Sequence, residues 1–372
     1  MRLSPAPLPM AFGAFGAVWG AWQAALPDLA AHYGLSTGPL GLMLTAGFAV
    51  SLPVMIATGK LIDRIGSQVG IAVTSISLGI GLATVGLLGP LPILVVGVVL
   101  LAAGSGSFDV AINGSAIGDA DWGRASRLTL LHASFSGGGL LGAVAAGGAI
   151  GAGIPFQAIY PVLGVILIAS ASLSLAGHRR PVVREGRVPR AVAITMLPLA
   201  ALAGLAFLAE GSMETWSAIY LRDSLGAAAF VGALGPGAFH AAMLIGRLVG
   251  AGMAGSLGAG ATLLASGSLI VAGMGVALAV PWLPVAIGAM FVAALGAAFM
   301  VPVVISLAGR RAGPYAGRAA SYVLSLGYAG FLIGPSAVGL LGEVAGLRIG
   351  LAVIPAAALI VMLASRSRIV RG

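Results

Sequence analysis

Cysteine is missing from this sequence, and charged residues are scarce. Without cysteine the chain can form no disulfide, no thiolate nucleophile and no zinc–thiolate site. Only 8% of the 372 residues are charged and 59% are hydrophobic, whereas a soluble domain has about 25% charged residues. A water-soluble core of this size could not hide so much apolar surface, which excludes an ordinary cytoplasmic enzyme. Disorder is excluded as well, because disordered chains are polar and highly charged.

Long apolar runs are what the sequence has in place of charge. A membrane-spanning helix needs about 20 apolar residues, and these runs lack the weak alternation of a membrane β-barrel. Reading them between charges and Gly/Pro breaks predicts an all-α membrane protein with twelve spanning helices, embedded in a lipid bilayer. The predicted spans cover residues 8–29, 37–58, 69–88, 91–117, 128–151, 155–177, 193–221, 228–254, 259–280, 283–308, 318–341 and 347–364.

The net charge of +9 has a membrane explanation. Placing both termini in the cytoplasm puts seventeen of the nineteen Lys and Arg residues on the cytoplasmic side, and leaves Arg222 and Arg348 in outer loops. Cytoplasmic loops of membrane proteins carry this kind of excess. We therefore expect both termini in the cytoplasm and no nucleic-acid partner.

A basic stretch after the sixth span divides the chain in two. Residues 178–190 read HRRPVVREGRVPR and are too short to form a domain. They separate an N-terminal six-helix bundle, 1–177, from a C-terminal six-helix bundle, 191–372. A 6+6 layout suggests two bundles related by a pseudo-two-fold axis, with a solute site between them near the membrane midplane. Within the fifth span, the spacing of Gly138 and Gly142 predicts close helix packing.

The loop between the second and third spans carries a recognisable motif. Residues 59–66 read GKLIDRIG and resemble the signature G-x-L-x-D-R-x-G of the major facilitator superfamily. Gly59 and Gly66 permit a tight turn with positive φ, and Asp63 can cap a helix or pair with a basic residue. The resemblance implies a cytoplasmic gate in which Asp63 and Arg64 favour the outward-open state. An ordinary charged turn is the alternative.

Further stretches along the whole chain are similar to one branch of this superfamily, the small bacterial permeases distantly related to the fucose permease. In the second half, the loop expected at residues 246–258 keeps Arg247 of the gate motif but has Gly255 where an acid is expected. Two departures from the branch, Ala25 and Thr215, remove charges that it often has. The resemblance implies the major facilitator fold, in a bacterial inner membrane. The stretches that carry it are 22–27, 109–113, 132–140, 209–216 and 327–343.

Polar residues inside the predicted spans need a reason, because a charged side chain at the bilayer centre costs about 2.5–3.5 kcal/mol on insertion scales. Asp109 and Asn113 lie one turn apart on the fourth span, and His132 is expected at comparable depth on the fifth. These three could bind a polar solute or relay a proton. A hydrogen-bond cluster that holds helices together is the alternative.

A second acidic pair lies in the seventh span. Glu210 and Glu214 are spaced i, i+4, which brings their Cβ atoms to about 6 Å, and two such carboxylates in a low dielectric resist ionising together. One would then hold a proton, as a proton-coupled carrier requires. We expect Glu210 to be the buried member, with Glu214 nearer the hydrated outer surface. His240, near the middle of the eighth span, is either a solute ligand or a neutral core histidine.

Aromatic and amide side chains complete the candidate solute site. Trp22, Gln23, Trp216 and Tyr328 could stack on or hydrogen-bond to a ring-shaped solute, with Trp22 the strongest candidate. Aromatic residues are also common as membrane-interface anchors. The sequence contains no motif with metal-ligand spacing, and neither a metal nor a cofactor is expected.

These features favour a secondary active transporter that moves a small polar or amphipathic solute, sugar-like or an organic metabolite, by alternating access and coupled to protons. A monomer is expected. A multidrug or metabolite exporter is the nearest alternative, although such antiporters usually carry a Gly-Pro signature in the fifth span, which has no proline here. A transporter-like sensor that no longer transports is the other. An enzyme is not expected, because no nucleophile–base or metal constellation is present.

Overall fold

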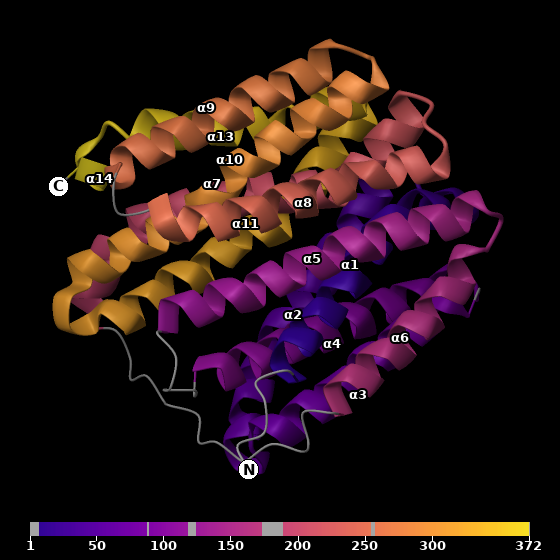
Figure 1. The fold of residues 1–372 in the computed structure, drawn as a ribbon, viewed down its shortest axis with the longest axis horizontal. Helices are drawn as coiled ribbons and strands as arrows, with labels where there is room; N and C mark the ends of the chain where they lie inside the picture. The colour runs from indigo at the N-terminus through magenta and orange to yellow at the C-terminus, as the bar shows by residue number, and fades with distance from the viewer. Residues whose placement is uncertain (1–6, 88, 118–123, 173–188, 254–256, 372) are drawn as a thin grey trace. The chain divides into compact units, whose positions relative to one another are not determined.

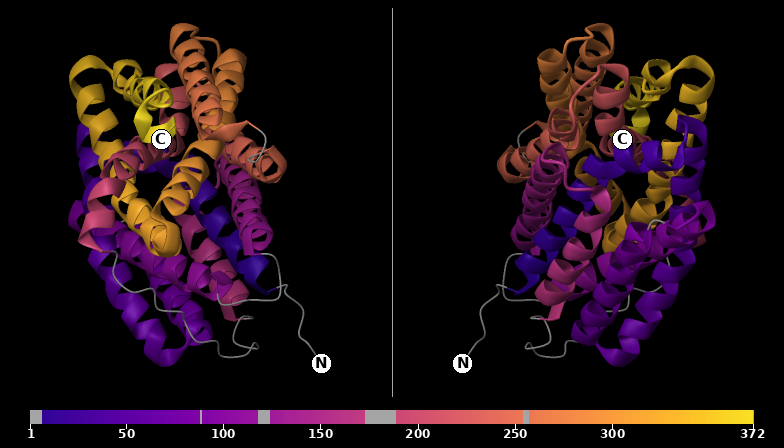
Figure 2. Two further views of the ribbon diagram at one scale, coloured as in Figure 1. Left: turned by 90° about the vertical axis from the view of Figure 1, so that its left-hand side faces the viewer. Right: turned by 90° about the vertical axis from the view of Figure 1, so that its right-hand side faces the viewer.

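The computed structural model describes residues 7–87, 89–117, 124–172, 189–253 and 257–371, and within these ranges the chain is helical and has no strand (Figure 1). Figure 2 shows the same helices from two further sides. Helices satisfy their own backbone hydrogen bonds, which is what a chain in lipid requires. The first six are α1 (Pro7–Tyr33), α2 (Thr37–Ile65), α3 (Ser67–Gly86), α4 (Leu91–Ile117), α5 (Arg124–Gly151) and α6 (Phe156–Ser172).

The second half repeats this series. Its long helices are α7 (Arg190–Ile219), α8 (Ala229–Met253), α9 (Gly258–Ala279), α10 (Leu283–Ala312) and α11 (Ala316–Ala345), followed by α12 (Leu347–Gly350), α13 (Val353–Ala364) and α14 (Arg368–Arg371). A π-helical turn, η2 (Tyr220–Ser224), follows α7, and a 3-10 turn, η3 (Gly313–Tyr315), precedes α11.

Each of the twelve predicted spans contains a helix, which confirms the all-α membrane fold. Nine described segments are long and apolar enough to cross a membrane, and one of them, Leu283–Ala345, contains both α10 and α11. The last span is broken, since α12 and α13 are separated by Leu351 and Ala352. The predicted linker 178–190 lies outside the described residues except for Pro189 and Arg190.

The chain forms two compact units. Unit 1 comprises Met1–Leu35, Leu42–Val183 and Ala228–Gly237, and unit 2 comprises Ser36–Gly41, Arg184–Ala227 and Ala238–Gly372. In unit 1, α1 packs on α5 and α6, and α3 packs on α4 and α6. In unit 2, α7 packs on α11 and α13, and α9 packs on α10 and α13. Each pair in the first unit therefore recurs six helices later in the second.

Glycine sets the closeness of the most extensive helix pair in each unit. A Cβ added at Gly138 of α5 would collide with the carbonyl oxygen of Gly13 on α1, and one at Gly142 would collide with the backbone of Ala17. On α11, a Cβ at Gly330 would collide with the carbonyl oxygen of Gly204 on α7. Lipid chains are as apolar as the helices, so small residues that allow van der Waals packing drive such pairing. The close packing predicted from Gly138 and Gly142 is confirmed.

Candidate functional site

An acid–base cluster in unit 2 is built on two helices. Glu210 and Glu214 lie one turn apart on α7, and His240 lies on α8 with its Nε2 atom 3.7 Å from Glu214 Oε1. His240 is 1% exposed and Glu214 is 8% exposed, whereas Glu210 is half-buried. The prediction that Glu214 lies nearer a hydrated surface is therefore wrong. A carboxylate and an imidazole enclosed at this distance can share a proton.

Arg247 supplies the positive charge of this cluster. It lies on α8, two turns after His240, and interacts electrostatically with Glu210, Glu214 and Tyr328. The predicted loop at residues 246–258 begins too early, since α8 continues to Met253 and Arg247 lies inside the helix. Glycines such as Gly246 interrupt the sequence pattern, but membrane helices tolerate them where another helix packs closely, as Ala298 does here.

The charges of the cluster do not cancel when both carboxylates are ionised. Two carboxylates and one guanidinium leave one negative charge as long as His240 is neutral. In a membrane such an excess charge is costly, so binding of one proton or one cation is favoured. Within the described part of the chain, no three His, Cys, Asp or Glu side chains are grouped to hold a metal ion.

Aromatic residues lie beside this cluster. Tyr328 of α11 stacks on Phe207 of α7, with ring centroids 4.9 Å apart and an interplanar angle of 20°. Trp216 is fully buried, and its ring is close to Gly339 of α11, where an added Cβ would lie 3.1 Å from Cζ2. The indole Nε1 of Trp216 has no hydrogen-bond partner among the described residues. Tyr328 therefore has an interaction with Arg247 as well as a stacking partner, while Trp216 lies within the α7–α11 packing.

Unit 1 holds the second predicted polar group. Asn113 Nδ2 donates to Asp109 Oδ1 at 2.9 Å and to the Asp109 carbonyl oxygen at 3.0 Å, so these two residues meet on one face of α4 as their spacing predicted. His132 of α5 lies edge-on to Phe12 of α1, with ring centroids 5.6 Å apart. The structure thus joins the acid to the amide, and places the imidazole against the first helix.

The two predicted solute residues of α1 are both buried. Trp22 packs against Tyr160 of α6, with ring centroids 5.7 Å apart, and Gln23 is the next residue along the helix. Enclosed polar atoms such as the Gln23 amide need hydrogen-bonding partners, because burying them without any is costly. These side chains are therefore part of the interior of unit 1.

The gate motif forms the end of α2 and a single sharp turn. Gly66 has φ +88° and donates its N–H to the carbonyl oxygen of Ile62 at 2.8 Å. Gly59, Asp63 and Arg64 belong to the last two turns of α2. The expectation that both glycines form the turn is thus correct for Gly66 and wrong for Gly59, which is helical because the helix does not end until Ile65.

One functional candidate was missed by the sequence reasoning. Glu343, near the end of α11, accepts hydrogen bonds through Oε2 from the Gly38 N–H at 2.8 Å and from Thr37 Oγ1 at 3.2 Å, within unit 2. The carboxylate thereby caps the first turn of α2, as a capping side chain does. A signal was available, because Glu343 is the only acid in the sequence after Asp223.

Comparison with known proteins gives one consistent result. The family model of the Major Facilitator Superfamily matches residues 8–335. An MFS-type transporter of Yersinia pestis is 28% identical over 347 residues, covering 91% of this chain and 89% of that protein. The nucleoside transporter NupG has a similar fold, with a TM-score of 0.81, 10% identity and coverage of 96% of this chain and 98% of that chain. The transporter FucP in its outward conformation has a TM-score of 0.67, 16% identity and 97% coverage of both chains.

Proposed function

This chain belongs to the Major Facilitator Superfamily of membrane transporters, and on that premise we propose that it is a proton-coupled secondary transporter of a small polar or amphipathic solute that works by alternating access. The observation that carries the proposal is the cluster of Glu210, Glu214, His240 and Arg247. A carrier couples its solute to an ion only if the ion binds one of its states better than the other. A cluster that lacks one positive charge has that property, provided that its access to water differs between the states.

The proton is assigned to the Glu214–His240 pair. These two groups are the most enclosed of the cluster, and their atoms lie 3.7 Å apart. Glu210 interacts electrostatically with Arg247, which leaves Glu214 as the carboxylate whose charge is unmatched. When the pair holds one proton, the four side chains together are neutral. The pair then titrates as one unit rather than as two separate groups.

Solute binding is assigned to the remaining polar and aromatic candidates. Asp109 and Asn113 offer a hydrogen-bonded acid and amide, and Tyr328 offers a hydroxyl on a stacked ring. The other candidates are Trp22, Gln23, His132 and Trp216. Asp109 is a second candidate for proton coupling because it too is an acid in a predicted span. These assignments suit a solute with hydroxyl, amide or ring groups, such as a sugar-like or other organic metabolite.

The proposal also covers the gate and the membrane placement. Asp63 and Arg64, at the end of α2, would set the balance between inward-open and outward-open states without contacting the solute. Arg247, predicted as part of the same gate, is assigned instead to the charge balance of the cluster. The protein would lie as a monomer in the bacterial inner membrane with both termini in the cytoplasm, as the distribution of Lys and Arg favours.

Transport in proteoliposomes tests this function. A thermal-shift screen of sugars and organic metabolites identifies a solute, and its uptake is then measured with and without an imposed pH gradient. We expect accumulation with the gradient, loss of accumulation in Glu214→Gln, and retention of solute exchange at equal concentrations. Asp223→Asn, which neutralises an exposed acid on η2, is the matched control and should behave as the parent. Equal accumulation by the parent and by Glu214→Gln would assign coupling to another group.

A further inference from the structure

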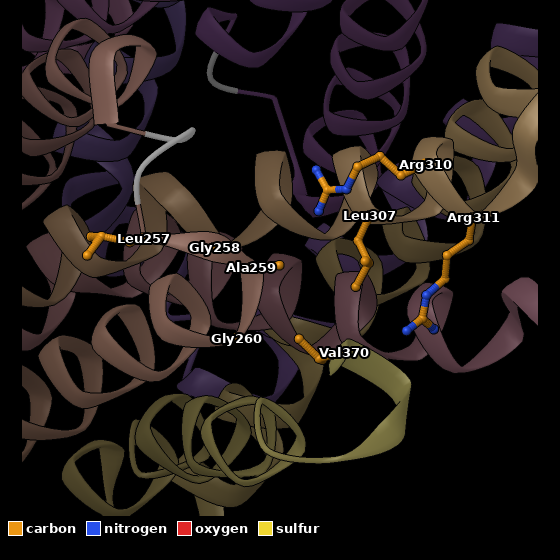
Figure 3. Close-up of a pocket in the computed structure, with 8 residues that line it drawn as sticks. All are labelled: Leu257, Gly258, Ala259, Gly260, Leu307, Arg310, Arg311 and Val370. Carbon is orange, nitrogen blue, oxygen red and sulfur yellow. The ribbon is translucent and has the colours of Figure 1, made fainter. Parts of the chain in front are cut away.

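A cavity in unit 2 shares no lining residue with the acid–base cluster. Its volume is about 720 Å³ (Figure 3). One side is the start of α9, and the other is the last turns of α10, with one residue from α14. Leu307 and Val370 lie between the two sides in Figure 3. The lining residues are Leu257, Gly258, Ala259, Gly260, Leu307, Arg310, Arg311 and Val370.

The charge of this cavity is positive and has no local counterpart. Arg310 and Arg311 line it, and the sequence contains no Asp or Glu between residues 224 and 342 or after residue 343. The helices that form the cavity, α9, α10 and α14, are therefore free of acids. Cytoplasmic arginines are common in membrane proteins, but here two of them face a hollow.

The two guanidinium groups are only partly occupied by the protein. Arg310 Nη1 donates to Ser306 Oγ at 2.7 Å, and Arg311 Nη2 donates to the carbonyl oxygen of Arg368 at 3.2 Å. A guanidinium has five N–H donors, so several remain. The Nε atom of Arg311 is buried and has no hydrogen-bond partner within the described residues. Such a buried donor is costly unless a ligand accepts from it.

The opposite wall adds backbone donors. α9 begins at Gly258, with φ +73°, and the preceding residue, Leu257, makes no side-chain cap hydrogen bond. The first N–H groups of an α-helix have no partner within the helix, and the helix dipole is positive there. Gly258, Ala259 and Gly260 have little or no side chain, so a ligand can approach this backbone. An anion between α9 and α10 would meet N–H donors on one side and guanidinium groups on the other.

We propose that this cavity binds a phosphate-bearing anion. The two arginines match phosphate oxygens in geometry and charge, and the apolar Leu257, Leu307 and Val370 suit the organic part of a phosphate ester. Two sources carry this chemistry, the headgroup of an anionic phospholipid and a soluble phosphate ester. The site is independent of the proposed proton coupling, because it uses none of the same residues.

Binding to the purified full-length protein tests the site. One arm measures retention of a short-chain phosphatidylglycerol, with phosphatidylcholine as the zwitterionic reference, by native mass spectrometry. The other arm measures glycerol phosphate binding by calorimetry. We expect one of the two probes to bind, and Arg310→Gln with Arg311→Gln to weaken it at least tenfold. Retention of the lipid identifies a headgroup as the source, and binding of glycerol phosphate alone identifies a soluble ester.

Two further variants keep the test decisive. Arg348→Gln makes the same charge change at the other end of α9, where Arg348 Nη2 donates to the carbonyl oxygen of Ala279 at 3.3 Å, and it should bind as the parent does. Ala259→Asp places a carboxylate beside the arginines without removing them, and should weaken binding even if the arginine variants fail to fold. The proposal is overturned if neither probe binds the parent, or if Arg348→Gln weakens binding as much as the cavity variants.

Discussion

At the residue scale, Arg247 and its acidic partners set the electrostatics of unit 2. The guanidinium interacts with both Glu210 and Glu214, and Glu214 also lies 3.7 Å from His240. Each of these side chains is paid for by the others, since an isolated charge in a membrane helix is costly. The pairing therefore explains why a chain with so few acids keeps two of them one turn apart on α7.

Removing the guanidinium alone should be more damaging than removing it with a carboxylate. Arg247→Gln leaves two carboxylates without a positive partner, and breaking a buried charge pair costs about 3–5 kcal/mol in proteins. The double variant Arg247→Gln with Glu210→Gln removes one of those carboxylates, so we expect a higher unfolding temperature than for Arg247→Gln alone. Arg247→Lys keeps the charge and is the control. Independent, additive losses in the double variant would contradict the charge pairing.

The residues of this cluster were identified by sequence, but their partners were not. Glu210 and Glu214 stand out because acids are rare in the spans, and His240 because it is a lone imidazole in an apolar run. Their proximity depends on how α7 and α8 pack, which no local pattern encodes. The same holds for Glu343, whose capping of Gly38 joins residues far apart in the chain.

At the element scale, glycine determines how close the paired helices come. α5 against α1 and α11 against α7 are the same pair in the two units, and both have glycines whose added Cβ would collide with a backbone carbonyl oxygen. Such positions tolerate no side chain without a shift of one helix. Neighbouring glycines that face open space have no such constraint.

Two adjacent glycines of α5 should respond oppositely to alanine. Gly138→Ala adds a methyl group against the Gly13 carbonyl oxygen, and overpacking of this kind costs about 1–3 kcal/mol. Gly137→Ala meets nothing within 4 Å and gains helix propensity, worth up to about 1 kcal/mol. Thermal unfolding in detergent should show a lower midpoint for the first variant and an equal or higher midpoint for the second. Equal midpoints for both would refute the close α1–α5 packing.

Most of the elements could be predicted from sequence because apolar run length fixes a membrane helix. All twelve spans are helical, and α4 begins and ends where the sequence placed it, at Leu91 and Ile117. The errors concern ends and breaks. α8 runs through Gly246 and Arg247, and the last span breaks at Leu351 and Ala352, because packing partners decide whether a glycine or a short turn ends a helix.

At the scale of the whole molecule, two regularities describe the chain. The helix pairs of unit 1 recur in unit 2 six helices later, as expected for a fold built from a repeat. The Lys and Arg residues fall almost entirely on one predicted side of the membrane. Together these regularities support a transporter with one cytoplasmic face that carries both termini.

Labelling of introduced cysteines should establish this orientation, and the absence of native cysteine gives a clean background. Arg366→Cys, after α13, should react with a membrane-impermeant maleimide only from the cytoplasmic side. Ser224→Cys, at the end of η2, should react only from the outer side. Both sites are exposed in the structure, so failure to label cannot be ascribed to burial. The reverse pattern would invert the proposed orientation.

The central claim is that the Glu214–His240 pair exchanges one proton when solute binds, and a direct count of protons tests it. Purified protein in weakly buffered detergent solution is mixed with the solute identified by the screen, and the pH change is followed with an indicator dye. The account predicts a change of about one proton per solute bound in the parent and in Asp223→Asn, and none in Glu214→Gln. A parent that exchanges no proton, or a Glu214→Gln variant that exchanges as many as the parent, would contradict it.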